Sequence, residues 1–250
     1  MAVIMMRLDR ILTEMGAGSR QEVKKLIRKG QVTVNGNVIR KPEEKVQEES
    51  ADIRCLGLSF NYEPYVYYML NKPSGVISAT EDKKEHTVLD LLPKPVRTDL
   101  FPVGRLDKDT EGLLLITNDG DLAHQLLSPK KHVDKTYEAD ISGIVGEADI
   151  KAFSEGVDIG DETRTLPAKL EIISVDINQS LSSIRITIQE GRFHQIKRMF
   201  QSVGKEVLFL RRIRMGSLIL DPELKQGASR RLTPDELHKL KTTQKEEKKK

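Results

Sequence analysis

The sequence predicts an α+β protein in two parts, a small helical domain followed by a larger domain of mixed strands and helices. Three observations support this prediction. The first 30 residues contain two amphipathic helical segments, later segments such as LSSIRITIQ alternate apolar and polar residues as strands do, and no 20–50-residue repeat is present. We expect the small domain and its connection over residues 5–61, the larger domain over 62–240, and a disordered charged tail over 241–250.

Composition excludes several classes of protein. No apolar run approaches the ~18 residues that a membrane span needs, and no signal-peptide segment opens the chain, so we expect a cytoplasmic protein. The single cysteine, Cys55, cannot form an internal disulfide, and five scattered histidines show no zinc-ligand spacing. We therefore expect no metal and no cofactor. The net charge of +3 is too small to indicate a nucleic-acid partner, so the positions of the basic clusters decide this question.

The first domain begins with two short helices. Residues 8–15 have apolar side chains at i, i+3, i+4 and i+7, as an amphipathic helix does. In SRQEVKKLIRKG, Ser19 and Glu22 have the spacing of a capping box, and Gly30 ends the segment. The apolar residues expected to be buried in the second helix are Val23, Leu26 and Ile27.

The opposite face of the second helix is strongly basic. Its like charges repel one another by a few tenths of a kcal/mol per pair, which an acidic partner would relieve, although a basic face alone is equally typical of a solvated surface. The following VTVNGNVI contains Asn35-Gly36, the dipeptide favoured in type I′ hairpins. Together these features resemble the S4 domain, an RNA-binding module. The cations expected to contact RNA phosphates are Arg20, Lys24, Lys25, Arg28 and Lys29.

The second domain contains both kinds of element. YVYYML and LSSIRITIQ are predicted strands, the latter with Ile184, Ile186 and Ile188 on one face. DLAHQLL after Gly120 and HQIKRMFQSV before Gly204 have helical periodicity. This mixture indicates an α+β domain.

The acidic stretch GRLDKDTEGLLLITNDG allows three interpretations. As a Ca²⁺ loop it places acidic residues at positions 1, 3 and 5, but position 12 is Asn118 and residues 113–116 are a predicted buried strand. A glycosidase would need two facing carboxylates, one of them held protonated, which spacing does not exclude. Nearby basic clusters instead favour a phosphate-bearing substrate. The third interpretation is a single ionised carboxylate that attacks a nucleotide.

Four motifs support the third interpretation by resemblance. GRLD at 104–107, with Thr110 and the following GLL, resembles the catalytic motif of pseudouridine synthases of the RsuA/RluA superfamily. KTY at 135–137 and GRFHQIKRM at 191–199 match further motifs in the same order, as does NKPSG at 71–75. With the S4-like segment, the resemblance covers nearly all of residues 5–240. It is strongest to the RsuA-type branch, the RsuA/RluB/RluE/RluF family, whose members carry an N-terminal S4 domain.

The resemblance implies a fold, an activity and roles for residues. It implies a mixed, mainly antiparallel sheet flanked by helices, and isomerisation of uridine to pseudouridine without cofactor or metal. Asp107 would be the nucleophile, Lys197 its cationic partner, Tyr137 the ring that stacks on the flipped base, and Arg105 the residue that enters the vacated space. Many relatives have arginine at the position of Lys197, so the geometry of this pair is open.

Further basic and polar residues are expected to contact RNA. Arg230 and Arg231 are equally consistent with a solvated face. The expected RNA contacts outside the first domain are Lys72, Lys130, Lys131, Arg192, His194, Gln195, Arg198, Arg211 and Arg212.

The chain has no long insertion, and the residues of its KPSG and GRFHQIKRM motifs are most similar to those of the small-subunit enzymes. We therefore expect a monomeric enzyme that acts on 16S rRNA or on a small-subunit assembly intermediate. By resemblance, its target is uridine 516. A 23S rRNA synthase of the RluB, RluE or RluF kind is the alternative within the family. A non-catalytic ribosome-assembly factor that uses its S4 domain for binding is the alternative outside it.

Overall fold

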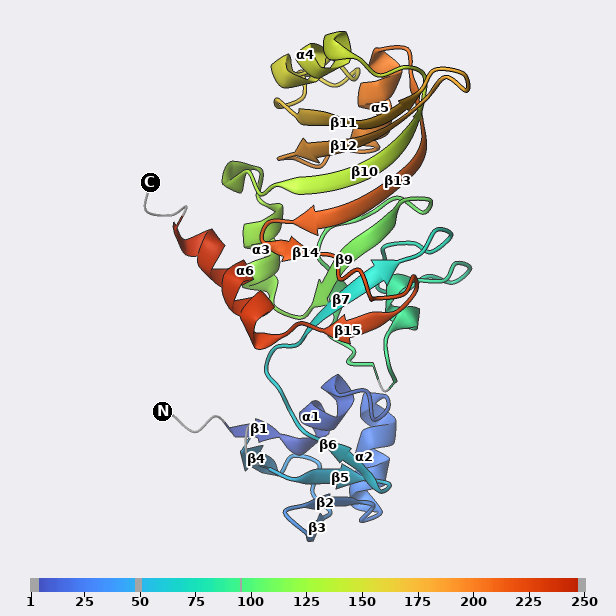
Figure 1. The fold of residues 1–250 in the computed structure, drawn as a ribbon. Coiled ribbons are helices and arrows are strands. Elements are labelled where there is room, and N and C mark those ends of the chain that lie inside the picture. Colours follow the sequence, from blue (N-terminus) through green and yellow to red (C-terminus); the bar gives the residue numbers. More distant parts are fainter. Residues whose placement is uncertain (1–4, 48–50, 95, 247–250) are drawn as a thin grey trace. The chain divides into compact units, whose positions relative to one another are not determined.

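The chain divides into two compact units, each with its own core (Figure 1). The first unit comprises Met1–Val66 and Leu92–Phe101, and the second comprises Tyr67–Leu91 and Pro102–Lys250. The computed structural model describes residues 5–47, 51–94 and 96–246.

The two helices of the first unit form where the sequence predicts them. Helix α1 (Leu8–Glu14) buries Leu8, Ile11 and Leu12, and helix α2 (Arg20–Arg28) buries Val23 and Ile27. The predicted capping box is confirmed, because the Ser19 backbone N–H donates to Glu22 Oε2 at 2.8 Å and the Glu22 N–H donates to Ser19 Oγ at 3.4 Å. Arg20, Lys25 and Arg28 of this helix are exposed, and Lys24 is half-buried.

Short antiparallel strands complete this unit. The predicted hairpin is confirmed, with Asn35 and Gly36 both at positive φ (50° and 80°), as a type I′ turn requires. The four-stranded sheet has the order β3-β2-β5-β6, and β1 pairs with β4. The strands are β1 (Met5–Arg7), β2 (Val32–Val34), β3 (Asn37–Ile39), β4 (Lys45–Gln47), β5 (Ile53–Cys55) and β6 (Leu58–Phe60).

Residues 92–101 return to the first unit, which the sequence pattern did not predict. Arg97 explains this, because its guanidinium is only 6% exposed and needs partners that this unit supplies. Its Nε and Nη2 donate to the two Asp99 oxygens at 2.9 and 2.7 Å, and its Nη1 donates to the carbonyl of Glu63. The Thr98 N–H also donates to the carbonyl oxygen of Glu14 at the end of α1, at 3.0 Å.

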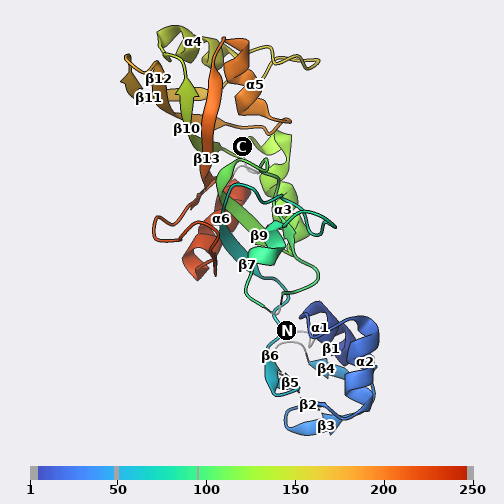
Figure 2. The same ribbon diagram turned by 90° about the vertical axis from the view of Figure 1, so that its right-hand side faces the viewer.

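The second unit is built on a nine-stranded sheet (Figure 2). Its main path has the order β11-β12-β10-β13-β9-β7-β15, while β14 pairs with β13 and β8 with β9. Only β9 and β13 pair in parallel within the described sheet, so the predicted mixed, mainly antiparallel sheet is confirmed. The strands are β7 (Tyr67–Lys72), β8 (Phe101–Pro102), β9 (Glu111–Thr117), β10 (Lys135–Ser142), β11 (Lys169–Asp176), β12 (Leu181–Ile188), β13 (Glu206–Met215), β14 (Leu218–Ile219) and β15 (Ser229–Arg231).

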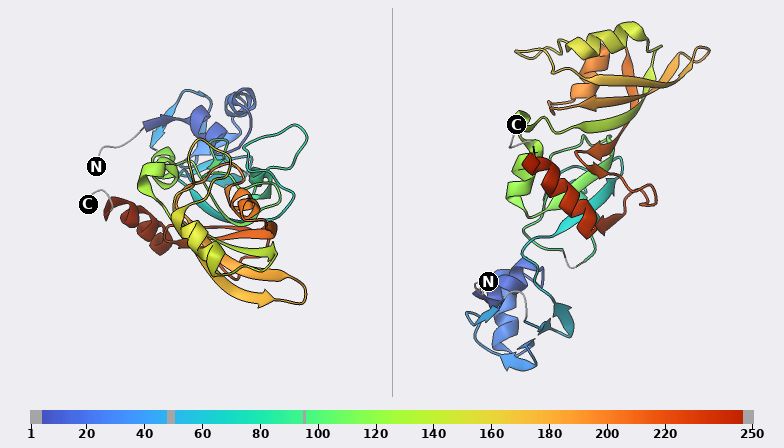
Figure 3. Two further views of the ribbon diagram at one scale, coloured as in Figure 1. Left: turned by 90° about the horizontal axis from the view of Figure 1, so that it is seen from above. Right: turned by 60° about the vertical axis from the view of Figure 1, so that its left-hand side comes forward.

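Helices flank this sheet. Helix α4 packs on β11 and α5 on β13, and the Phe153 and Phe200 rings of these helices meet edge to face with centroids 5.0 Å apart. Helix α3 lies beside α6 (Figure 3). No helix within the described residues is long and apolar enough to cross a membrane. The helices are η1 (Val88–Leu91), α3 (Gly120–Leu127), η2 (Pro129–Lys131), α4 (Glu147–Glu155), α5 (Gln195–Ser202) and α6 (Pro234–Glu246).

The prediction of disorder at 241–250 is wrong for residues 241–246, which are helical. Helix α6 continues to Glu246, and residues 247–250 lie outside the described part of the chain. Two contacts hold the helix at the point where the tail was expected to begin. Leu240 is 1% exposed, and Lys241 Nζ donates to Tyr67 Oη at 2.8 Å. A polar sequence therefore forms a helix here because one side of it packs on the second unit.

The parallel pairing of β9 with β13 positions the loop that precedes β9. Gly112 of β9 pairs with Arg212 of β13, which in turn pairs with Tyr137 of β10. A Cβ on Gly112 would lie 2.3 Å from the Arg212 carbonyl oxygen, and its φ is +96°, so only glycine fits this crossing. Three segments that are distant in sequence thus lie in register, and residues 104–110 emerge beside the start of β10.

Candidate active site

A hollow of about 590 Å³ opens in the second unit around the GRLD motif. Its wall includes Arg105, Asp107, Tyr137 and His194, so residues from three of the recognised motifs meet at one place. The same four residues also line a smaller pocket of about 80 Å³, to which Lys197 contributes. The structure therefore brings together all four residues expected to be catalytic, Arg105, Asp107, Tyr137 and Lys197.

The loop that carries Asp107 is held at several points. Lys72 Nζ donates to the carbonyl oxygens of Pro73, Lys108 and Thr110 at 3.0, 3.1 and 2.9 Å. Ser78 Oγ donates to the Leu106 carbonyl at 2.9 Å and accepts from the Leu106 N–H at 3.0 Å. These bonds tie the residues on both sides of Asp107 to residues 72–78, so its carboxylate has a defined position before any substrate arrives.

Lys72 is a structural residue and not an RNA contact, so this prediction is wrong. Its side chain is 0% exposed, and its three N–H donors are used by three backbone carbonyls. Burial lowers the pKa of Lys72 to about 8, and the nearby carboxylates of Asp109, Glu111 and Asp107 oppose the change. The NKPSG motif thus supplies an internal cation that orders the Asp107 loop.

Asp107 has two cationic or ionisable neighbours at 3.6 Å. They are His194 Nε2, next to Asp107 Oδ1, and Lys197 Nζ, next to Asp107 Oδ2. Lys197 binds more closely to Asp109, at 2.7 Å from both carboxylate oxygens. This hydrogen bond lowers the pKa of Asp109. Lys197 therefore lies between two carboxylates, of which the Asp109 side chain is 67% exposed and the Asp107 side chain 29%.

Tyr137 and Arg105 differ in exposure. Tyr137 is 7% exposed and projects from β10 between its partners Ile186 and Arg212 on the neighbouring strands. Arg105 is exposed at the mouth of the hollow. A buried ring and an exposed cation that line the same hollow as Asp107 are suited to holding an extruded base.

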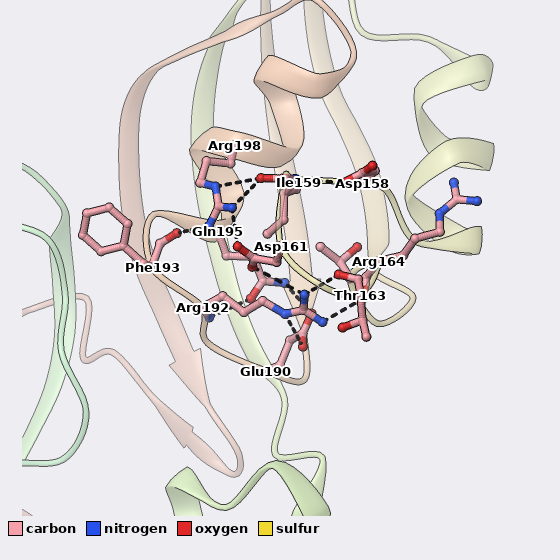
Figure 4. A network of polar contacts seen from close by, with 12 residues as sticks. Asp158, Ile159, Asp161, Thr163, Arg164, Glu190, Arg192, Phe193, Gln195 and Arg198 are labelled. Carbon is pink, nitrogen blue, oxygen red and sulfur yellow. Dashed lines mark hydrogen bonds and ion pairs between the residues drawn. The ribbon is translucent and has the colours of Figure 1, made fainter.

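The GRFHQIKRM segment is tied to residues 159–164 by two arginines (Figure 4). Arg192 Nη1 and Nη2 donate to the carbonyls of Thr163 and Arg164 at 2.7 and 2.8 Å. Arg198 Nε donates to the carbonyl of Ile159 at 3.0 Å, and Nη2 contacts Asp161, whose pKa is lowered by this hydrogen bond. Both guanidinium groups therefore bind protein acceptors, but their side chains are still 21% and 24% exposed, so the RNA contact predicted for them stays a prediction.

Gln195 and Arg212 are almost fully buried, yet Gln195 lines the smaller pocket and Arg212 lines the hollow, so their predicted contact with RNA stays a prediction. Gln195 is 4% exposed, and its Nε2 donates to Glu190 Oε1 at 2.9 Å. Arg212 is 2% exposed, and its Nε donates to the Leu113 carbonyl at 2.8 Å, where it joins β13 to β9. Arg211, the next residue along the same strand, is half-buried and is not among the described residues that line the hollow.

The other predicted RNA contacts remain on the surface. Lys130 is exposed and Lys131 half-exposed, both in the short helix η2, and the neighbouring Pro129 lines the hollow. In the first unit, Lys24 is half-exposed, and the other cations of α2 are exposed, as is Lys29 after the helix. These residues keep the accessibility that phosphate binding needs.

Sequence reasoning missed three residues of the site. Ser78 clamps the Asp107 loop, but an isolated serine carries no recognisable signal. Lys135, at the start of KTY, is 7% exposed and lines the hollow, where burial and then Arg212 lower its pKa to about 8. Phe193 is 72% exposed on the wall of the hollow, and an aromatic residue between Arg192 and His194 could have been recognised as unusual.

The chemistry available at this site follows from its residues. A positioned carboxylate flanked by cations can attack an electrophilic carbon, and the buried phenol beside it can hold a flat ring or move a proton. No group of three histidine, cysteine, aspartate or glutamate side chains within the described residues has the arrangement of a metal site.

Comparison with known proteins agrees with this site. Residues 66–202 match the RNA pseudouridylate synthase family, and residues 6–52 match the S4 domain. A solved structure described as a pseudouridylate synthase superposes with a TM-score of 0.65 and 35% identity, over 94% of this chain and 99% of the other.

Curated relatives cover almost the whole chain. The chain is 47% identical to the uncharacterized RNA pseudouridine synthase YtzG of Bacillus subtilis, over 94% of this chain and 98% of the relative. It is 40% identical to ribosomal large subunit pseudouridine synthase B of B. subtilis (94% and 96%). It is 39% identical to ribosomal small subunit pseudouridine synthase A of Escherichia coli (93% and 98%). With a family match over more than half of its length and these relatives, the chain belongs to the RNA pseudouridylate synthases, in the RsuA-type branch that carries an S4 domain, and is an isomerase that converts uridine to pseudouridine.

Proposed function

We propose that this enzyme modifies one uridine of 16S rRNA in the cytoplasm, the counterpart of uridine 516, with Asp107 as the nucleophile. The observation that carries the catalytic assignment is the position of Asp107 on the wall of the hollow, with its loop fixed by Lys72 and Ser78. The relative named as a small-subunit synthase, which is similar over nearly its full length, supports the choice of RNA.

The reaction is an isomerisation, so every atom is retained. An Asp107 oxygen forms a bond to the ribose or to the uracil ring, and the bond between N1 and C1′ breaks. The detached base turns, and a bond forms between C5 and C1′. If Asp107 is bonded to C1′, that bond breaks and the carboxylate leaves as the new bond forms; if Asp107 is bonded to the uracil ring, the carboxylate leaves when the double bond of the ring is restored. The C5 proton leaves, and N1 gains a proton. In this proposal the Tyr137 ring stacks on the flipped uracil, its hydroxyl takes part in moving the C5 proton, and Arg105 enters the space that the base leaves; both residues line the hollow with Asp107.

Lys197 lies between the two carboxylates of the site. Its ammonium is 3.6 Å from Asp107 and 2.7 Å from Asp109, and its hydrogen bond to Asp109 lowers the pKa of that carboxyl. His194 Nε2 lies 3.6 Å from the other oxygen of Asp107. The carboxylate proposed as the nucleophile is thus flanked on both sides by nitrogen-bearing side chains.

The S4 unit and the surface cations bind the RNA backbone. The four basic residues of α2 and Lys29, together with Lys130, Lys131 and His194, make contacts that position the RNA without selecting a base. The protein needs no second copy to complete its site, so we expect it to act as a monomer.

A second candidate substrate is 23S rRNA. The large-subunit synthase of B. subtilis is as similar to this chain as the small-subunit synthase of E. coli is, at 40% against 39% identity. The two candidates share the catalytic chemistry and differ only in the RNA that the enzyme recognises.

Two measurements test the proposal. Asp107→Asn should lower pseudouridine formation by at least about a thousandfold with RNA binding retained, because an amide cannot act as the nucleophile. Asp109→Asn and Glu111→Gln are the matched controls and should keep most of the activity. An Asp107→Asn enzyme with substantial turnover would remove Asp107 from the proposed role.

Mapping of pseudouridines in 16S and 23S transcripts after incubation with wild-type enzyme identifies the substrate. A single new pseudouridine in 16S rRNA supports the proposal, and one confined to 23S rRNA selects the second candidate.

A further inference from the structure

Phe193 is an exposed aromatic residue on the wall of the catalytic hollow. Its side chain is 72% exposed, and its ring stacks on that of His194 with centroids 3.8 Å apart and an interplanar angle of 19°. The steps proposed for Asp107, Tyr137 and Arg105 leave Phe193 without a role. An exposed aromatic ring on the wall of a site that takes a nucleotide lies where a base can stack on it.

The backbone around Phe193 is fixed in place. Arg198 Nη1 donates to the Phe193 carbonyl oxygen at 3.1 Å, and the Arg192 N–H donates to Gln195 Oε1 at 3.0 Å. His194 adopts a left-handed conformation with φ of 48°, which is uncommon for a residue with a side chain. In Figure 4 the Phe193 ring points away from the polar network that holds its backbone. The loop thus presents this ring outward, and the ring is not packed into a core.

The two stacked rings extend outward from the catalytic carboxylate. His194 Nε2 lies 3.6 Å from Asp107 Oδ1, and Phe193 covers one face of the imidazole. Since His194 covers one face of the Phe193 ring and the side chain is still 72% exposed, the other face is open. An open aromatic face is the feature on which proteins stack unpaired nucleobases.

We propose that Phe193 is a stacking site for a nucleobase next to the flipped uridine, with His194 as the ring behind it. When the uridine leaves the RNA stack, its neighbour loses a stacking partner, and the open face of Phe193 replaces it. The ligand is an RNA base of any identity, because stacking uses the flat face that all bases share. This inference rests on the proposed function in one respect, that RNA reaches Asp107 with the uridine extruded.

Binding of short rRNA fragments tests the proposal. Phe193→Leu keeps an apolar side chain without a flat face and should weaken binding about tenfold, whereas Phe193→Tyr should bind within about twofold of wild type. The kcat at saturating RNA should stay within a few-fold for both variants, so the loss should appear in KM. Ile177→Ala, at a site 80% exposed in the turn between β11 and β12, is the control for loss of an exposed apolar residue.

A fragment that lacks the base on one side of the target uridine identifies the contact. On one of the two abasic RNAs, wild type and Phe193→Leu should bind with equal affinity. On the intact RNA, wild type should bind more tightly than Phe193→Leu. Equal binding of intact RNA by wild type and Phe193→Leu, or an unchanged difference between them on both abasic RNAs, would overturn the proposal. Because binding is measured without turnover and on whichever rRNA fragment the wild type binds, an incorrect nucleophile or ribosomal subunit leaves this result interpretable.

Discussion

The basic residues of helix α2 and those around the Asp107 loop look alike in sequence but are used differently. No hydrogen bond or ion pair is made within the described part of the chain by the side chains of the four cations of α2 or of Lys29, which follows the helix. Lys72, Arg192 and Arg198 instead donate to backbone carbonyls and carboxylates of the second unit. A cation without a hydrogen bond or ion pair inside the protein is available to a phosphate, whereas a cation that donates to backbone carbonyls and carboxylates helps to maintain the fold. Proximity to a catalytic motif therefore does not identify an RNA contact.

The largest effect on stability is expected for Lys72. Lys72→Met keeps the volume and burial of the side chain but leaves three carbonyls without a donor, so the free energy of unfolding should fall by about 2–4 kcal/mol. Urea unfolding measures this change. Lys108→Met is the control, because its side chain is 52% exposed and pairs only with the exposed Glu85. Unchanged stability together with a reduced salt dependence of RNA binding would return Lys72 to the group of RNA contacts.

The next largest effect concerns RNA binding by α2. Changing Arg20, Lys24 and Arg28 together to alanine should weaken RNA binding about tenfold or more at low salt and reduce the slope of log K against log salt by about 2. The free energy of unfolding should change by less than about 0.5 kcal/mol, because these side chains make no hydrogen bond or ion pair within the described residues. A variant with Lys151, Lys169 and Lys225 changed to alanine makes the same change in charge elsewhere. Equal slopes for the two triple variants would show that α2 makes no specific contact.

A smaller effect is expected for Arg198. Arg198→Gln removes the donors to Ile159 and Asp161, so the free energy of unfolding should fall by about 1–2 kcal/mol. Protease should also cut residues 158–164 faster. The salt slope of RNA binding should not change. The exposed Arg164, at the other end of the same loop, provides Arg164→Gln as the control. A lower salt slope with unchanged protection from protease would contradict the structural role.

The smallest effect tests Arg230, for which the sequence left two interpretations open. Arg230 Nη1 and Nη2 donate to the two Glu236 oxygens at 2.8 Å, and this hydrogen bond lowers the pKa of Glu236 to about 2. The folded-state pKa lies below the unfolded value of 4.5, so the pair stabilises the protein above about pH 4.5 and loses this contribution as pH falls toward 2. Glu236→Gln should lower the free energy of unfolding at pH 7 by only about 1 kcal/mol, because solvent screens this partly exposed pair.

Unfolding measured from pH 2 to pH 7 checks this expectation. The difference between wild type and Glu236→Gln should shrink below pH 4.5, and a constant difference would assign the effect to packing.

Much of the fold could be predicted because its signals are local. The Ser19 capping box, the Asn35-Gly36 turn and the alternation of Ile184, Ile186 and Ile188 depend on residues a few positions apart, and each is present as predicted. The order of the catalytic motifs, recognised by resemblance, likewise led to the residues that line the hollow.

Other features depend on which distant segments pair, and no local pattern encodes them. The parallel crossing of Gly112 and Arg212 decides that the Asp107 loop lies beside Tyr137. Packing against Tyr67 keeps the polar residues after Leu240 helical, and acceptors around Arg97 bring residues 92–101 into the first unit. The same holds for charge, because burial and the acceptors within reach decide whether a lysine faces phosphate or backbone. Those two quantities exist only once the strands have assembled, so Lys72 and Lys24 differ in the folded protein although each is simply a lysine in the sequence.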